Sequence, residues 1–160
     1  MLENWREQYR EISDIYKIDI NTGETKKLME NANTPTSAPD GTKIAVVEMN
    51  GERKNYPQII RVIDSSGKTF KVLNGKDFSL GFLDSKMMWS GDSTKLVVRG
   101  YKERDAERDQ FVIIYDVTTE ESKVLPFNNS ELHYDGKHFL NVNEDGTEII
   151  FSQMGSLKTY

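Results

Sequence analysis

Two short sequence elements alternate along this chain, and each recurs three times. In the first element, an apolar and largely β-branched run ends at an aspartate, and a polar turn then leads to a second run that closes on leucine. The aspartates that end the three runs are Asp19, Asp64 and Asp116. Because β-branched residues favour the pleated strand and Gly or Asn tolerates the left-handed dihedral angles of tight turns, each copy predicts a β-hairpin.

The second element is a tight turn that holds an aspartate and a threonine and leads into an apolar strand. Its aspartates are Asp40, Asp92 and Asp145, and each can cap its turn by accepting a backbone N–H. A repeat of about 50 residues with four strands in each unit is typical of β-propeller blades. The sequence therefore predicts an all-β fold of four-stranded antiparallel propeller blades, with an ordinary antiparallel sandwich as the alternative.

The order of the elements predicts two complete blades and two half blades. If the strands of a blade are named A to D from the central channel outward, the chain opens with a C–D pair, continues with two whole sets and ends with an A–B pair. The expected ranges are 14–20 and 24–28, then 34–73 and 86–126, then 138–142 and 147–153. Closed propellers generally have four or more blades. Three arrangements follow: a fragment of a longer propeller, an open three-blade arc, or a homodimer whose halves join into a six-bladed ring.

Residues 1–13 precede the repeats, which occupy residues 14–160. Four apolar side chains of this segment fall at helical spacing: Leu2, Trp5, Tyr9 and Ile12. This spacing predicts a short helix with one apolar stripe. Such a helix would cover an open edge of the blades or dock a partner, and a charged loop between strands is the third interpretation.

At these repeats the sequence resembles the TolB-like β-propeller family. That family alternates a turn of the Trp-Ser-Pro-Asp-Gly type with a strand of the Ile-Tyr-Val-Met-Asp type. The turn is closest in residues 38–45 and the strand in residues 15–19, whereas residues 89–93 keep the tryptophan but lose the proline and the final glycine. The resemblance covers roughly residues 14–153. It implies a propeller like those of periplasmic scaffold proteins, secreted lipoproteins, certain lyases and prolyl-oligopeptidase-type peptidases.

Composition excludes several classes of protein. The net charge of −5 would repel phosphate, and the basic residues of segment 102–109 are interleaved with acids, so we expect no binding to nucleic acid. The chain has no cysteine, which removes disulfides and thiolate sites. No apolar run is long enough to span a bilayer. Residues 1–7 are charged where a signal peptide is apolar, so the compartment stays open; the bacterial periplasm or cell surface is expected if the chain is a trimmed mature fragment.

Candidate ligand sites are few, and each has a simple structural interpretation. Residues 67–69 read Gly-Lys-Thr, like the end of a phosphate-binding loop, but Val62 stands where that motif needs a glycine. We therefore predict a hairpin turn there. His133 and His138 flank a turn that contains Asp135, and we interpret them as surface residues rather than metal ligands.

No residue is assigned a catalytic, cofactor-binding or metal-binding role. The chain has no Gly-x-Ser-x-Gly elbow, and capping explains its turn carboxylates. Trp89 is expected in the blade core or the wall of the inner channel, with a ligand-stacking role as the alternative. Residues 128–130 match the glycosylation acceptor pattern, which we interpret as coincidence.

We therefore expect a non-catalytic binding or scaffold module and not an enzyme. It would engage a protein or peptide partner through the top-face loops 50–57, 74–85 and 100–109. Aromatic residues of these loops are Tyr56, Phe78, Phe82 and Tyr101. The alternative is the propeller portion of a prolyl-oligopeptidase-type peptidase or a lyase, with its catalytic residues outside this chain.

Overall fold

The computed structural model describes residues 13–48, 59–74, 82–104, 107–127 and 140–151. Within these ranges the chain forms twelve β-strands and no helix. The strands are β1 (Ile15–Ile18), β2 (Thr25–Met29), β3 (Ala32–Ser37), β4 (Lys43–Glu48), β5 (Ile59–Asp64), β6 (Thr69–Asn74), β7 (Phe82–Trp89), β8 (Lys95–Arg104), β9 (Glu107–Asp116), β10 (Ser122–Phe127), β11 (Leu140–Val142) and β12 (Ile149–Phe151).

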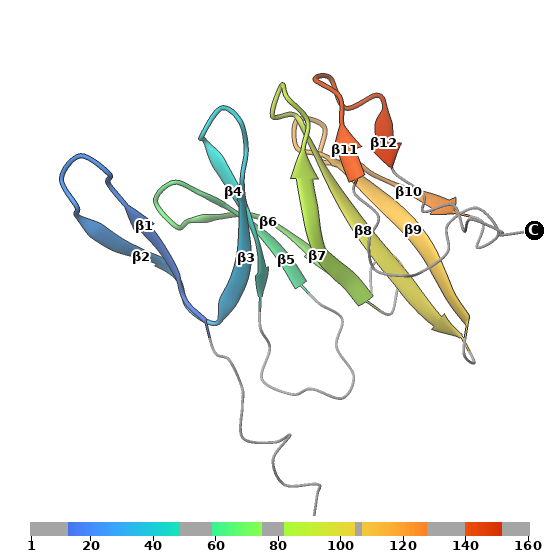
Figure 1. Ribbon diagram of the computed structural model, residues 1–160, viewed down its shortest axis with the longest axis horizontal. Coiled ribbons are helices and arrows are strands. Elements are labelled where there is room, and N and C mark those ends of the chain that lie inside the picture. The colour runs from blue at the N-terminus through green and yellow to red at the C-terminus, as the bar shows by residue number, and fades with distance from the viewer. Residues whose placement is uncertain (1–12, 49–58, 75–81, 105–106, 128–139, 152–160) are drawn as a thin grey trace, which may run out of the picture.

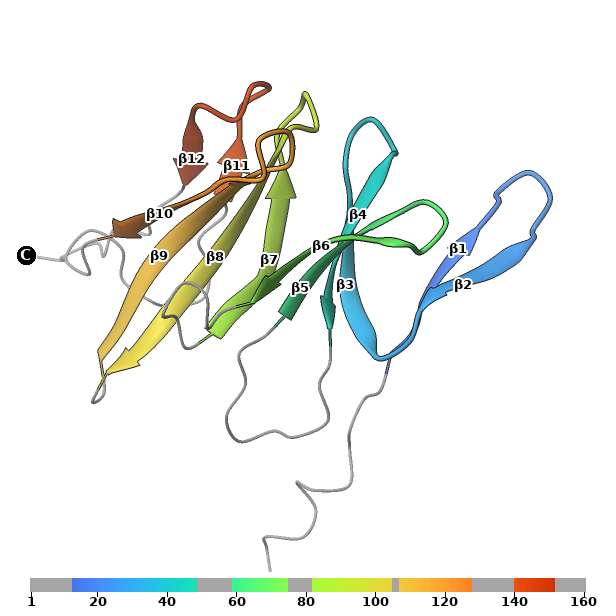
Figure 2. The same cartoon turned by 180° about the vertical axis from the view of Figure 1, so that it is seen from behind.

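The strands form four antiparallel sheets that follow the chain order. We call them the N-terminal half-blade (β1–β2), the first whole blade (β3–β6), the second whole blade (β7–β10) and the C-terminal half-blade (β11–β12). The sheets stand side by side, with the two half-blades at opposite ends of the row (Figures 1 and 2). The all-β prediction and the predicted order of two complete and two half blades are confirmed.

The second whole blade corrects one sequence prediction. Segment 100–109 was expected to be a top-face loop, but β8 continues to Arg104 and β9 begins at Glu107, so the charged segment forms a long hairpin. Its register places residues of opposite charge across from each other, as in Lys102 opposite Asp109 and Glu103 opposite Arg108. Opposite charges on facing strand positions favour pairing. The alternating charges that suggested a solvated loop are therefore the pattern of a solvated hairpin.

Two further sequence predictions concern the ends of the chain and membrane spans. The helix predicted for residues 1–13 lies outside the described ranges except for Ser13, and it stays a prediction. Among the described residues, no helix has the length and apolar character needed to cross a membrane.

Each whole blade is apolar on both faces, which explains its unbroken runs of apolar residues. In β4, Ala45 and Val47 pack toward the second whole blade, whereas Val46 packs toward the N-terminal half-blade. Successive side chains of a strand point to opposite faces of the sheet. A strand covered on both faces therefore needs apolar residues at every position instead of every second one.

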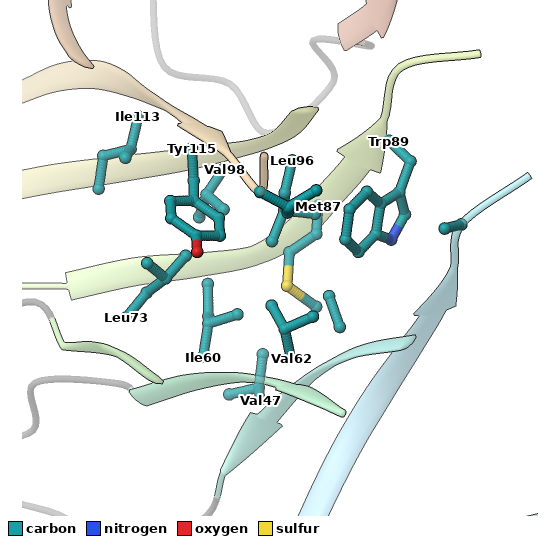
Figure 3. Packing of buried hydrophobic residues seen from close by; sticks show 13 residues of the cluster. Val47, Ile60, Val62, Leu73, Met87, Trp89, Leu96, Val98, Ile113 and Tyr115 are labelled. Carbon is teal, nitrogen blue, oxygen red and sulfur yellow. The ribbon is translucent and has the colours of Figure 1, made fainter. Parts of the chain in front are cut away.

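The largest core lies between the two whole blades. Ile60 and Val62 of β5 face Ile113 and Tyr115 of β9 across this interface (Figure 3). A smaller cluster between the N-terminal half-blade and the first whole blade includes Ile15. The core therefore consists of layers between successive sheets, and each sheet buries its faces only against its neighbours in the chain.

Candidate functional site

Six aspartates occupy the hairpin turns, and all six cap their own turns. In every case a carboxylate oxygen accepts the backbone N–H of the residue two positions later, at 2.8–3.1 Å. The aspartates are Asp19, Asp40, Asp64, Asp92, Asp116 and Asp145. Three of the turns join the inner strands of a blade and three join the outer strands. The predicted capping role is confirmed, and it accounts for the recurrence of aspartate in both sequence elements.

The capping bonds lower the pKa of all six carboxyl groups, because hydrogen-bond donors stabilise the charged form. The effect is largest at Asp92, whose pKa falls to about 2. The hydroxyl of Ser90 donates to Asp92 at 2.6 Å, and the N–H and hydroxyl of Thr94 donate as well. A carboxylate held this way stays ionised at neutral pH and suits a structural role better than proton transfer.

The inner turns also join each blade to the next. The N–H of Asp40 donates to the hydroxyl oxygen of Ser93 at 2.9 Å, and the N–H of Asp92 donates to the carbonyl of Glu144 at 2.7 Å. The ammonium group of Lys95 donates to the carbonyl of Asp145 at 2.6 Å. In both whole blades, the aspartate of the inner turn thus donates its backbone N–H to the following sheet. These two bonds fix the spacing between the inner strands of neighbouring sheets.

Sequence reasoning did not find the role of Ser93. This residue stands where the other two repeats have glycine, and it adopts a positive φ of 62°, where Gly41 and Gly146 have φ of 71° and 69°. The backbone of Ser93 is strained at this φ. Its hydroxyl oxygen, however, accepts a hydrogen bond from the N–H of Asp40, which glycine cannot do. A serine at a position where both other repeats have glycine is the sequence signal for this contact.

A partly buried ion pair was also missed. The guanidinium of Arg61 binds the carboxylate of Glu48 at 2.6 Å, and both side chains are mostly buried. Arg61 stands where the third repeat has the buried Ile113. A single arginine within an apolar strand was the available signal, since a charge at such a position needs a partner.

Trp89 lies in the core, as predicted. It is buried at the end of β7, within the cluster between the whole blades (Figure 3). Its indole N–H donates to the carbonyl of Thr36 in β3 at 2.9 Å, which links the inner strands of neighbouring blades. Because its ring packs among core residues, the ligand-stacking alternative is not favoured.

Of the remaining sites predicted from sequence, one is a confirmed turn, and most of the others lie outside the described residues. Gly67 has a φ of 92° in the turn between β5 and β6, so the predicted hairpin turn is confirmed. The histidine pair 133 and 138, the segment 128–130, loop 50–57 and most of loop 74–85 lie outside the described residues. Phe82 begins β7 and Tyr101 pairs with it from β8, so these two residues belong to strands and not to loops.

The described residues do not form a metal site. No group of three or more His, Cys, Asp or Glu side chains in these ranges is arranged to hold a metal ion. The turn carboxylates are instead bound by N–H and hydroxyl groups of their own turns. In the described part of the chain, these carboxylates therefore serve the turns that carry them.

Comparison with known proteins reveals one informative likeness. No family model matches the chain, and no curated protein matches it. Among solved structures it is similar to an oligogalacturonate lyase in complex with manganese, with a TM-score of 0.61 and 17% sequence identity. The match covers 92% of this chain and 37% of the lyase chain. The fold is that of a β-propeller.

This likeness corrects the expectation that the protein is not an enzyme. The structural neighbour is itself an enzyme, and it has the same fold. The lack of a nucleophile motif, on which the expectation depended, is therefore a poor guide to activity for this kind of chain. The chain spans little more than a third of the length of that lyase.

Proposed function

We propose that this chain is the propeller portion of a lyase-type enzyme whose catalytic residues lie outside the chain. The observation that carries this proposal is the likeness to an oligogalacturonate lyase along nearly the whole of this chain but only 37% of the other. The described residues contribute capped turns and inter-blade contacts. A part with these properties suits the support of an active site rather than the chemistry itself.

The name of the lyase gives the proposed substrate class, an oligosaccharide of uronic acids. Such a substrate carries many negative charges, and this chain has a net charge of −5. Like charges repel, so binding of such a substrate needs a locally positive site or a bound cation. The described residues do not provide a set of metal ligands. We therefore assign no catalytic step to a metal in this part of the chain, and the reacting groups are supplied by another part of the enzyme.

We also propose that the blades are TolB-like repeats. Support comes from the turn of residues 38–45 and the strand of residues 15–19, which are closest to the family pattern. The capping aspartates give these motifs a physical reason, because each holds its turn through hydrogen bonds. Binding of a protein or peptide partner by the loops 50–57 and 74–85 stays a prediction.

The proposal is tested with the enzyme assembly as it occurs in its native source. The chain is tagged, its native assembly is purified, and the assembly is incubated with oligogalacturonate with and without manganese. Elimination from a uronic acid leaves a double bond that absorbs ultraviolet light, so the reaction is followed by absorbance. We expect absorbance to rise with the assembly and not with the 160-residue chain alone.

Two results would contradict the proposal in different ways. If the chain alone performs the elimination, the catalytic residues lie within it and their proposed location is wrong. If the native assembly eliminates from no uronic-acid oligosaccharide, the proposed lyase function is wrong.

A further inference from the structure

Strand β1 leaves apolar side chains exposed on one face of the N-terminal half-blade. Tyr16 and Ile18 of β1 are 55% and 60% exposed, and Ile20, in the turn that follows β1, is 91% exposed. The opposite face of this half-blade is covered, because Ile15 packs into the cluster with the first whole blade. Tyr16 and Ile18 therefore lie on the face that is turned away from the rest of the described chain.

The positions equivalent to Ile18 are buried in the other two repeats. The aspartates that follow the strands align the three copies: Asp19, Asp64 and Asp116. Ile18 then corresponds to Ile63 and Tyr115, both 0% exposed. Ile20 corresponds to Val117, 6% exposed, in the second whole blade and to the exposed Ser65 in the first. Ile63 and Tyr115 pack against the sheet that precedes their own. Ile18 thus occupies a position that this fold covers with a preceding sheet.

At the other end of the row, side chains of the second whole blade are incompletely covered. Ile114 and Leu125 of the second whole blade are only half-buried, although the equivalent Val62 and Leu73 are 0% and 3% exposed. Ile114 alternates with Ile113, which packs on the first whole blade, so it faces the C-terminal half-blade. That half-blade has its inner two strands, β11 and β12, in the described ranges. An outer pair of strands there would cover the half-buried side chains.

We propose that a second copy of this chain completes both half-blades. The β1–β2 pair of one copy completes the sheet that β11–β12 of the other copy begins, and a twofold axis repeats the junction. Two such junctions close a ring of six four-stranded blades and pair the open edges of β1 and β12. This interface goes beyond the proposed enzymatic function and does not depend on it.

The whole blades give the register of the junction. Lys43 of β4 stands opposite Asp64 of β5, and the second whole blade repeats this pairing with Lys95 and Asp116. By the same alignment, Glu148 of one copy stands opposite Asp19 of the other.

This register has two consequences for the junction. Ile149 then stands opposite Ile18, which places Ile18 within a continuous sheet. Glu148 and Asp19 bring two like charges together where the whole blades have opposite charges, and this weakens the junction.

The molar mass in solution tests the interface. Light scattering of the 160-residue chain at micromolar concentration should give twice 18.4 kDa. Ile18→Asp places a charge in the junction and should give the monomer mass. Phe70→Asp is the matched control, because Phe70 is also an exposed strand residue, at 51%, but lies on β6 of the first whole blade, away from both ends of the row. Glu148→Lys should lower the dissociation constant by roughly a few-fold, because it restores an opposite-charge pair.

A second variant guards against a trivial loss of folding. Ile20 is the most exposed of the three side chains, so Ile20→Asp has little effect on folding of the single chain and should also shift the mass toward the monomer. Circular dichroism confirms that each variant keeps its β-sheet. A wild-type chain that is monomeric at this concentration would overturn the proposal. A dimer that persists in both aspartate variants would overturn it as well.

Discussion

The side chains with the clearest roles are the small polar residues of the turns. Asp92 receives hydrogen bonds from Ser90 and Thr94, while its own N–H reaches the next sheet at Glu144. Sequence patterns predicted the caps, because aspartate two residues before threonine in a tight turn has one common use. They did not predict the contacts between turns of neighbouring sheets, because those depend on how the sheets stack.

The lowered pKa values predict acid sensitivity with a definite sign. An aspartate whose pKa is lower in the folded chain than its ordinary value of 3.8 stabilises the fold above that value. This stabilisation disappears as the pH falls through the folded-state pKa, which is about 2 for Asp92. The urea midpoint should therefore fall between about pH 4 and about pH 2, and Asp92→Asn should make this dependence shallower.

The acid prediction has a simple control. Glu121→Gln removes an exposed carboxylate that caps none of the described turns, so its curve of midpoint against pH should keep more of the wild-type slope than the Asp92→Asn curve. Equal flattening by both variants would contradict a specific role for the turn caps.

Ser93 offers a second test at the residue scale. Ser93→Ala loses the bond to the N–H of Asp40 and keeps the positive φ, so it should lower the free energy of unfolding by about 1 kcal/mol. Ser93→Gly loses the same bond but removes the strain of a positive φ, which offsets about 1 kcal/mol. Urea unfolding of both variants should therefore rank alanine below glycine. The reverse order would mean that the backbone at Ser93 is not strained.

At the scale of elements, hairpins were predictable and their ends were not. The apolar runs that end at an aspartate located β5 and β9 from sequence, because a strand covered on both faces has few polar residues. The long β8–β9 hairpin was missed. Its outer part depends on pairs such as Lys102 and Asp109, whose complementarity becomes visible only when the register is known.

The turn between β5 and β6 gives a prediction at this scale. A Cβ atom added to Gly67 would lie 2.5 Å from the carbonyl oxygen of Leu28 in the N-terminal half-blade. Gly67→Ala should therefore push this half-blade away from the first whole blade. Gly41→Ala is the matched control, because Gly41 also has a positive φ but has no neighbouring atom within 4 Å of an added Cβ.

The two glycine variants separate strain from contact. The control should lower the free energy of unfolding by about 1 kcal/mol, the cost of a side chain at positive φ. Gly67→Ala should cost clearly more in the same urea titration, because it adds a clash with backbone. Equal costs for the two variants would show that the half-blade does not pack on this turn.

At the scale of the whole molecule, the chain is a row of sheets that ends in two halves. The repeat predicted this count from sequence, because strand order follows from the alternation of the two elements. The faces left open could not be predicted in the same way. Tyr16 and Ile18 belong to a strand whose pattern matches the buried strands, and only their exposure in the structure separates them from Ile63 and Tyr115.

A cross-link between two copies tests the six-bladed ring most directly. The chain has no cysteine, so single cysteines can be placed at will. The register of the whole blades puts Lys17 of one copy opposite Ile150 of the other. Lys17→Cys and Ile150→Cys chains are mixed, oxidised and separated on a non-reducing gel.

The expected result is a disulfide-linked pair that contains one chain of each kind. Each variant oxidised alone should give little of this band, and a mixture of Lys17→Cys with Glu148→Cys should give less, because that pair is out of register. If the mixed chains stay at the monomer mass, or if cross-linking does not depend on the position of the cysteine, the half-blades of two copies do not join and the ring is not formed.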